Sequence, residues 1–435
     1  MALENVKHRA KMVMNMATES KKIGAEDPRK ILHSLKVGLA MAAVSLIYYF
    51  DLFRDGYSTG SGLYAMWAVN TVAVVFEFSI GATIGKGVNR TLATVVGGAL
   101  GVGAHGATSF AGNTAESIML AFIIFFICGV ATFGRFIPKL KARNDYFFLI
   151  VIVTYGLIAV STFRGEKLIE MAEKRLSTVL VGYATVLVCC CICPCWAGQD
   201  LHTLVATNID TLGTFLADFG DEYFETANSN DKSHEIRASM EGYRAVINSK
   251  SVEESLVNFA KWEPRHGKFR YWHPWDHYVK IGAFTRECAC KLDALHACLD
   301  SDMQAPSGIR ERMKEACTAM SSECGNALRE AAQGMRTMTR SALADAHVSN
   351  AEAGANNLKL LLQTPVWGDA RLLDVCPAAT VASLLVQIVS CTADVVDSVH
   401  QLANLSKFSN PNEVKPHHTH ADVVLVNLPI GNVER

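Results

Sequence analysis

Acidic residues are scarce among the apolar stretches of the first 198 residues, and the charges near those stretches are mostly lysine and arginine. Charged residues make up only 19% of the whole chain, and the net charge of −1 averages this apolar part with a more polar second part. A membrane pathway lined with basic side chains favours anions over cations. The shortage of acidic residues therefore argues against a cation pathway and points to anions.

Six apolar segments follow one another in this first part, with no intervening polar domain. Each is long enough, at about 1.5 Å per residue, to cross about 30 Å of hydrocarbon. The second and third segments are the weakest, because the second contains Glu77 and the third is rich in glycine. We predict membrane-spanning helices at 31–50, 62–80, 87–110, 115–134, 146–163 and 176–196.

After Gln199 we expect no further membrane span of about 20 apolar residues. The sequence from there is more highly charged and shows helical periodicity. We therefore predict an all-α membrane protein in four parts. These are a cytosolic N-terminal segment (1–30), a six-span domain (31–198), a cytosolic helical domain (199–408) and a flexible tail (409–435).

Lysine and arginine gather before the first segment and in the loop at 135–143. Because cytosolic loops are enriched in these residues, both places are expected to face the cytosol. Six spans return the C-terminal domain to the same side, so that both termini are cytosolic and 51–61, 111–114 and 164–174 face outside. The first thirty residues lack the apolar core of a cleavable signal.

No cysteine lies in a predicted outer loop, although the chain has 13 of them. An oxidising exterior favours disulfides, so this distribution predicts reduced thiols. The run Cys189, Cys190, Cys191, Cys193 and Cys195 could be palmitoylated or bind a metal, but it lacks the paired spacing and the histidines of a zinc site. We favour small packing residues.

The sequence lacks a nucleotide-binding loop and a catalytic constellation. Gly101, Gly103 and Gly106 match a dinucleotide fingerprint, but they lie within an apolar segment without a preceding soluble strand. The pairs Gly81 with Gly85, and Gly97 with Gly101, instead suggest close helix packing. We expect no enzyme activity and no cofactor.

Three basic residues in the apolar part are candidates for an anion pathway: Lys86, Arg90 and Arg175. Lys86 and Arg90 are four residues apart and share one helix face, and Arg175 is expected to open the last span from the opposite side. A lysine or arginine at mid-membrane costs about 2.5 to 3.5 kcal/mol on insertion scales and usually faces protein or water. The alternative is that these side chains extend to the lipid headgroups.

Short motifs along nearly the whole chain resemble those of the plant aluminium-activated malate transporter family of anion channels. They lie at 26–29, 33–40, 65–69, 75–78, 85–90, 103–105, 175–178, 196–200 and 261–267. The last contains that family's hallmark in the soluble half, formed by Trp262, Glu263, Pro264, Arg265, His266 and Gly267. The resemblance implies a homodimer whose pore lies on the dimer axis, lined by basic residues at Lys86, Arg90 and Arg175.

The implied function is passive conduction of malate and other small anions across the plasma membrane or the vacuolar membrane. Two alternatives remain. A secondary carrier could export organic or aromatic acids through the same six spans, and a membrane-anchored interaction protein could use the spans as a tether only. The number of spans and their buried cations exceed what a tether needs.

Some members of this family respond to external aluminium, which requires hard oxygen ligands on the outer face. Glu166 and Glu170 match acidic positions of those members, and Asp51 or Asp55 could join them from the first outer loop. Lys167 adds a repelling charge beside Glu166, and we favour an ordinary solvated acidic face. In the soluble half, the aromatic-rich stretch 269–277 and the preceding hallmark motif are expected to form a packed corner.

Overall fold

Helices form the regular structure in the part of the chain that the computed structural model describes. That part comprises residues 2–50, 61–110, 113–161, 168–224, 242–269, 273–299, 305–363 and 372–408. The only bridge of the β type among these residues joins His266 to Phe269. The all-α fold class is therefore confirmed, and the tail from 409 onward lies outside the described residues.

The chain divides into two compact units, the first comprising Met1–Thr211 with Asn228–Ala297 and the second comprising Leu212–Ala227 with Cys298–Arg435. Helix α8 (Ala197–Phe224) contributes to both. The first unit also holds α1 (Ala2–Glu26), α2 (Pro28–Tyr49), α3 (Ser61–Val75), α4 (Ile80–Thr108), α5 (Asn113–Gly134), α6 (Pro138–Ser161), α7 (Leu168–Cys191), α10 (Lys250–Ala260) and α11 (Trp275–Leu299). The second holds α12 (Ser307–Thr337), α13 (Ala342–Gln363) and α14 (Leu372–Ser406).

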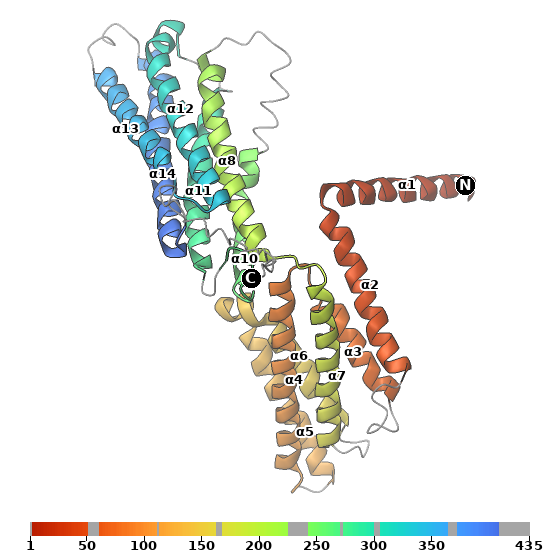
Figure 1. The fold of residues 1–435 in the computed structure, drawn as a ribbon. Coiled ribbons are helices and arrows are strands. Elements are labelled where there is room, and N and C mark those ends of the chain that lie inside the picture. Colours follow the sequence, from red (N-terminus) through yellow and green to blue (C-terminus); the bar gives the residue numbers. More distant parts are fainter. Residues whose placement is uncertain are drawn as a thin grey trace, which may run out of the picture. The chain divides into compact units, whose positions relative to one another are not determined.

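Within the first unit, α4 packs against α6 and α7, and α5 packs against α4 and α6 (Figure 1). Helix α3 packs against α2 and α7. Large apolar side chains on α5 are nonetheless exposed, including Phe122, Phe125 and Phe133. Exposed apolar surface of this extent is unusual for a soluble protein and is typical of a surface that faces lipid.

Four described helices are long and apolar enough to cross a membrane by length and composition: Pro28–Tyr49, Ala115–Gly134, Ile169–Cys191 and Val375–Ser406. Two shorter apolar helices occupy Met66–Val75 and Asn144–Val160. The first three long helices and both shorter ones overlap five of the six predicted segments. Helix α4 overlaps the remaining predicted segment, 87–110, but carries Lys86, Arg90 and many glycines, which lower its hydropathy.

The prediction that no apolar stretch long enough to span a membrane follows Gln199 was wrong, because Val375–Ser406 in α14 is long and apolar enough by composition. The burial of its apolar side chains explains why a helix outside the first part is so apolar. Leu385, Ile388 and Val395 are fully or almost fully buried, and α14 packs against α12 and α13 (Figure 1). The exposed positions of α14 include Gln387 and Asp394. We therefore describe α14 as the core helix of a bundle, whose one polar face meets water.

Two predicted boundaries near the basic residues were also wrong. Helix α3 ends at Val75, and α4 already begins at Ile80 because Ser79 caps it: the Ser79 side chain accepts a hydrogen bond from the backbone N–H of Ala82 at 3.3 Å. Helix α7 begins at Leu168, within the predicted outer loop, and ends at Cys191 shortly before Pro194. Arg175 therefore lies two turns inside α7 and does not open it.

Candidate functional site

Arg90 is buried within α4 and is held by neutral groups. The residue is 3% exposed. Its Nε donates to Thr71 Oγ1 on α3 at 3.0 Å, and its Nη1 donates to Tyr146 Oη on α6, also at 3.0 Å. No carboxylate contacts it among the described residues. The positive charge of Arg90 is therefore not compensated within the described chain, which is costly for a buried group.

Arg175 on α7 has a similar environment and is 6% exposed. Its Nη2 donates to Thr154 Oγ1 on α6 at 3.3 Å, and its guanidinium carbon lies 3.8 Å from the centroid of the Trp67 ring on α3. The cation and the aromatic face attract one another. The Nε atom of Arg175 is buried and has no hydrogen-bond partner. One donor of this guanidinium is thus available to an acceptor that the chain does not supply.

Both arginines reach the same two helices, α3 and α6. Trp67 and Thr71 are one turn apart on α3, where Thr71 Oγ1 donates to the Trp67 carbonyl at 2.7 Å. Tyr146 and Thr154 are eight residues apart on α6, about 12 Å along its axis. The two guanidinium groups repel one another. Like charges placed together without an acidic partner are unfavourable in an ordinary core, and an anion would relieve the repulsion.

Lys86 differs from the two arginines because it has an acidic partner. Its Nζ forms an ion pair with the Glu77 carboxylate, and it lies 5.9 Å from the centroid of the Tyr146 ring. The side chains of Lys86 and Glu77 are 37% and 36% exposed. Tyr146 thus contacts both Lys86 and Arg90. In the sequence, Glu77 is a charge that weakens the second apolar segment, and nothing there indicates that it pairs with Lys86.

A cleft of about 560 Å³ has several charged side chains in its wall, one of which is Lys86. Asn89, Lys141, Lys261 and Tyr146 also line it. Three of the charges in its wall are paired: Lys86 with Glu77, Lys261, whose Nζ lies 2.6 Å from Asp276, and Asp145, which is bonded to Arg135. Lys141 has no ion-pair partner among the described residues. The cleft is therefore basic on balance, and its wall includes Tyr146, which accepts a hydrogen bond from Arg90.

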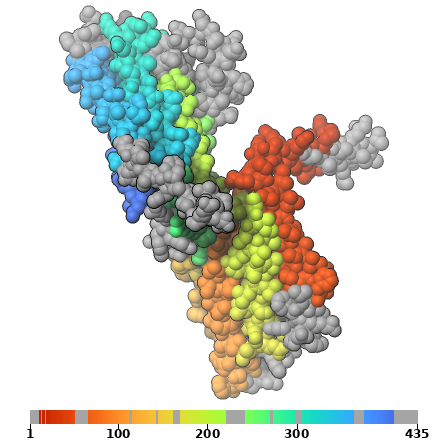
Figure 2. All heavy atoms as spheres, in the orientation of Figure 1, coloured from red at the N-terminus to blue at the C-terminus, as the bar shows by residue number. Residues whose placement is uncertain are grey.

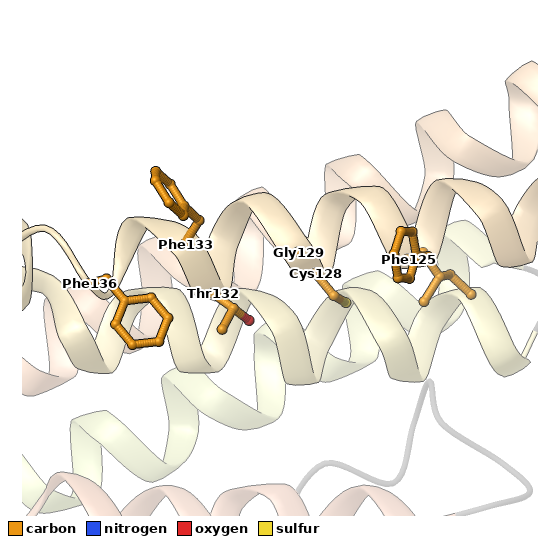
Figure 3. A pocket seen from close by; sticks show the side chains of 7 residues that line it. Phe125, Cys128, Gly129, Thr132, Phe133 and Phe136 are labelled. Carbon is orange, nitrogen blue, oxygen red and sulfur yellow. The ribbon is translucent and has the colours of Figure 1, made fainter.

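A second hollow, on α5, has the opposite character. It has a volume of about 430 Å³ and is lined by Phe125, Cys128, Thr132 and their neighbours. Figure 3 shows the rings of Phe133 and Phe136 beside this helix, and both residues are more than two-thirds exposed. It carries no charged group. An anion would find no partner there, and the surface suits lipid chains.

The hallmark motif joins the first turns of two helices. Glu263 accepts hydrogen bonds from the backbone N–H groups of Ala197 and Gly198, at 2.6 and 3.0 Å, at the start of α8. It is also bonded to the backbone of Gly81 at the start of α4. Burial raises the pKa of the Glu263 carboxyl, while these backbone hydrogen bonds act in the opposite direction. One carboxylate thus caps α8 and contacts the helix that carries Lys86 and Arg90.

Glycines allow the motif to approach α4 closely. A Cβ atom at Gly81 would overlap the carbonyl oxygen of Phe259, and one at Gly85 would lie 3.1 Å from the Trp262 ring. The predicted pair Gly81 and Gly85 therefore packs against α10 and the hallmark motif. The pair Gly97 and Gly101 allows α4 to pack closely against α6, since a Cβ atom at Gly97 would lie 2.8 Å from Thr154.

His266 and the rest of the motif form a turn. The imidazole ring of His266 stacks on the indole of Trp196, with centroids 3.9 Å apart and planes 3° apart. Gly267 has a φ of +49°, in the left-handed region that suits glycine. Pro264 and Arg265 are exposed. The Pro264 carbonyl oxygen lies 2.9 Å from His266 Nδ1, whereas Arg265 forms no ion pair among the described residues.

Two further motifs meet at the start of α2. Asp27 caps this helix, and Arg29 bonds to Asp27 and, through Nη1, to Asp200 Oδ1 at 2.7 Å. The Arg29 guanidinium lowers the pKa of the Asp27 carboxyl. Lys36, which is buried, donates to the Cys193 carbonyl at 2.7 Å beyond the end of α7. Motifs about 170 residues apart in the sequence therefore hold one another in place.

A cluster of buried polar side chains lies beside the aromatic-rich stretch 269–277. Tyr278 Oη lies 2.8 Å from His202 Nδ1 and 3.1 Å from His273 Nε2, and all three residues are buried. Burial, with the nearby His202 and His266, lowers the pKa of His273 to about 4. Phe269 and Trp275 pack around this cluster. The described residues of the stretch 269–277 thus form the packed corner that its composition predicted.

Of the four predicted aluminium ligands, Asp51, Asp55 and Glu166 lie outside the described residues. Glu170 is in the first turn of α7, where its Oε1 lies 2.7 Å from Lys174 Nζ and its side chain is 49% exposed. Within the described residues, no group of three or more histidine, cysteine or acidic side chains is arranged to hold a metal ion. In the cysteine run, Cys189, Cys190 and Cys195 are buried, whereas Cys191 and Cys193 are exposed.

Comparison with known proteins places these features in one family. A family model described as aluminium activated malate transporter matches residues 21–367. The chain belongs to the aluminium-activated malate transporter family. Aluminum-activated malate transporter 2 of Arabidopsis thaliana is 47% identical over 401 residues, which cover 92% of this chain and 79% of the relative. Aluminum-activated malate transporter 1 of Triticum aestivum is 39% identical, over 91% of this chain and 87% of the relative.

Membership in this family agrees with the resemblance found in the motifs. Aluminum-activated malate transporter 1 of Arabidopsis thaliana is 44% identical over the same share of the chain, 92%, and 81% of its own length. The match to the family model includes α2 to α7 and the hallmark motif, and ends before α14. The basic site between α3 and α6 therefore lies wholly within the part that defines the family.

Proposed function

We propose that this protein is an anion channel that conducts malate and other small organic and inorganic anions passively across a plant membrane. The observation that carries the proposal is the pair of buried arginines, Arg90 and Arg175, whose hydrogen-bond and ring partners among the described residues are all neutral. Malate is named in the relatives of this chain. Membership in a family of transporters supports a role in transport, and we propose no enzyme activity.

Electrostatic attraction offsets the loss of water from the anion. One pair of opposite unit charges about 4 Å apart gains roughly 4 kcal/mol at an effective dielectric constant of about 20. A dianion beside Arg90 and Arg175 would gain several such contributions, and the unpartnered Nε of Arg175 would donate a hydrogen bond to it. Conduction also requires that the anion leave again. The repulsion between the two guanidinium groups favours entry of the anion.

Lys86 and the cleft beside it would form the inner entrance. Lys86 lies about 6 Å before Arg90 along α4, since an α-helix rises about 1.5 Å per residue. Its ion pair with Glu77 moderates its charge. An anion collected by the cleft would therefore meet weak attraction first and stronger attraction deeper in the bundle, which draws it inward.

The proposed assembly is a homodimer of six-span subunits, with the pore on the dimer axis. Helices α2 to α7 would be the six spans, and both termini would face the cytosol, because the basic residues of 1–30 and 135–143 favour that side. The plasma membrane is the proposed location, with the vacuolar membrane as the alternative. Asp51, Asp55, Glu166 and Glu170 would then face outside.

Recording of anion currents distinguishes this proposal from its alternatives. A channel gives large reversible currents with unitary steps when malate, nitrate and chloride are exchanged on each side. A secondary carrier of organic or aromatic acids gives slow coupled flux without unitary steps, and a tether gives neither. Slow flux that saturates with substrate, with no unitary event, would replace the channel by the carrier.

The arginine pair is tested directly by charge reversal. Arg90→Glu or Arg175→Glu should abolish the anion current while the protein still reaches the membrane, because a carboxylate repels the dianion where it must shed water. Arg312→Glu, on the exposed side of α12, is the matched control and should leave the current unchanged. Wild-type malate currents from both pore variants would refute the assignment.

A further inference from the structure

The inner end of α7 carries two exposed cysteines beside exposed apolar side chains. Helix α7 ends at Cys191, and Cys191 and Cys193 are both exposed, whereas Cys189, Cys190 and Cys195 in the same run are buried. Val188 is 68% exposed and Ile192 is 60% exposed. In Figure 2, α7 forms part of the visible surface between α4 and α2. Thiols and apolar groups are therefore exposed together where a candidate span ends.

We propose that Cys191 and Cys193 are sites of S-acylation by a long-chain fatty acid. In this reaction the cysteine thiolate attacks the carbonyl carbon of a long-chain acyl-coenzyme A. A new carbon–sulfur bond forms at the cysteine, the thioester bond of acyl-coenzyme A breaks, and the coenzyme A thiolate takes up a proton. No oxidant or reductant is needed. Cysteines next to the membrane are common sites of this modification.

Position and packing select these two residues from the thirteen cysteines of the chain. The acyl chain attached to either would leave the protein beside Val188 and Ile192, which already present apolar surface to lipid. Each buried CH₂ group of such a chain contributes about 0.8 kcal/mol to membrane attachment. The buried neighbours at 189, 190 and 195 pack within the bundle and cannot reach an acyl donor without opening it.

The local backbone keeps the two thiols in place. Lys36 donates to the Cys193 carbonyl at 2.7 Å, and the Cys195 carbonyl accepts a hydrogen bond from the backbone N–H of Ile80 at 3.0 Å. The segment between α7 and α8 is therefore fixed against α2 and the start of α4. An acyl chain here would hold this segment, and with it the start of α4, at the membrane surface.

The proposal rests on the cytosolic placement of this end of α7, and it does not require anion conduction. The test uses the full chain expressed in plant cells. Unmodified thiols are blocked, thioesters are cleaved with neutral hydroxylamine, and the released thiols are captured and located by mass spectrometry. Wild-type protein should be captured only after hydroxylamine treatment, at 191 or 193. The double variant Cys191→Ser with Cys193→Ser should reduce capture to the level seen without hydroxylamine.

The matched control is the double variant Cys189→Ser with Cys195→Ser, which removes two buried thiols from the same run and should keep wild-type capture. The yield of detergent-solubilised protein on size-exclusion chromatography verifies that each variant folds. Absence of capture from the wild type, or capture that persists in the variant lacking both exposed cysteines, would overturn the proposal. Because the readout is chemical, a failure here differs from a failure of the anion currents.

Discussion

Threonine hydroxyls hold the two buried guanidinium groups, and this gives a prediction at the scale of single residues. Thr71→Val keeps the shape of the side chain but removes the acceptor of Arg90 Nε. A hydrogen bond to a charged group contributes about 1.5 to 3 kcal/mol, so the anion current should fall by roughly tenfold or more at equal surface expression.

Thr94→Val is the control for this prediction. Thr94 is also buried on α4, but its hydroxyl donates to the Arg90 carbonyl and does not contact the guanidinium. Patch-clamp currents of both variants, normalised to protein at the membrane, separate the two roles. Equal losses in Thr71→Val and Thr94→Val would mean that general packing, and not the position of the guanidinium, controls the current.

The buried His273 predicts a specific pH dependence of stability. Its pKa is lowered from 6.5 to about 4 in the folded protein, so the unfolded chain takes up the proton first as the pH falls. The stability that the neutral imidazole contributes is therefore present above about pH 6.5 and is lost progressively as the pH falls towards 4. The melting temperature of the solubilised protein should decrease over this range.

His273→Gln should reduce that decrease, because glutamine does not titrate. His277→Gln, two residues after Trp275 on the same helix and only partly buried, should leave it unchanged. Melting temperatures at pH 7 and pH 5 for the three proteins supply the comparison. If the pH dependence of His273→Gln matches that of the wild type, the buried imidazole does not control it.

Charge in an apolar segment was enough to select Arg90 and Arg175 from the sequence, because a buried guanidinium always needs an explanation. Their partners Thr71, Thr154 and Trp67 carry no such signal. Threonine and tryptophan are ordinary residues in apolar helices, and only the packing of α3 and α6 shows which of them meet the arginines. Glu77 was visible as a charge, but its pairing with Lys86 depends on the break between α3 and α4.

At the scale of elements, the close contact between α4 and the hallmark motif gives a prediction about glycine. Gly81→Ala should destabilise the protein, because the added methyl group would overlap the Phe259 carbonyl, which belongs to the backbone and cannot rotate away. Overpacking of this kind typically costs about 1 to 3 kcal/mol. The melting temperature should fall and the yield of assembled protein should decrease.

Gly103→Ala is the control on the same helix, since nothing lies within 4 Å of a Cβ at that position. It should be neutral or slightly stabilising, because alanine favours helix over glycine by about 1 kcal/mol. Thermal melts of the two variants against the wild type are the measurement. A stable Gly81→Ala protein would show that α4 and α10 do not need their close approach.

Hydropathy located the apolar helices well but misjudged their ends and one of their environments. The end of α3 and the start of α4 depend on a cap at Ser79, which lies inside an apolar stretch and is easily read as part of a span. Helix α14 has the composition of a span, yet its buried face packs in a bundle. Mean hydropathy counts apolar residues and does not tell a lipid-facing side from one that another helix covers.

At the scale of the whole molecule, the all-α class and the family follow from patterns that are repeated along most of the chain. The proposed pore is different, because a pathway on a two-fold axis would belong to two copies, and each copy would contribute half of its wall. Lys86, Arg90 and Arg175 could be selected one by one from the sequence, but a ring of them would arise only in the proposed assembly. The same holds for an outer site built from several loops.

The two sides of the membrane give the final prediction, which concerns aluminium. We expect the chain to conduct anions without it, because Glu170, one of the proposed outer carboxylates, is already paired with Lys174. A trivalent aluminium ion needs several charged oxygen donors, and the Lys174 ammonium group beside the Glu170 carboxylate would repel the ion. Currents recorded at acidic external pH, where aluminium stays soluble, should therefore be the same with and without the ion.

The prediction would be contradicted by an increase in current that is seen only when aluminium is added outside and that is lost in the double variant Glu166→Gln with Glu170→Gln while the basal current persists. That result would place a hard oxygen site on the outer face. Lys174→Gln provides the matched test of the reason given: if the lysine is what prevents binding, its removal should make the channel responsive from the outside and leave it unresponsive from the cytosolic side.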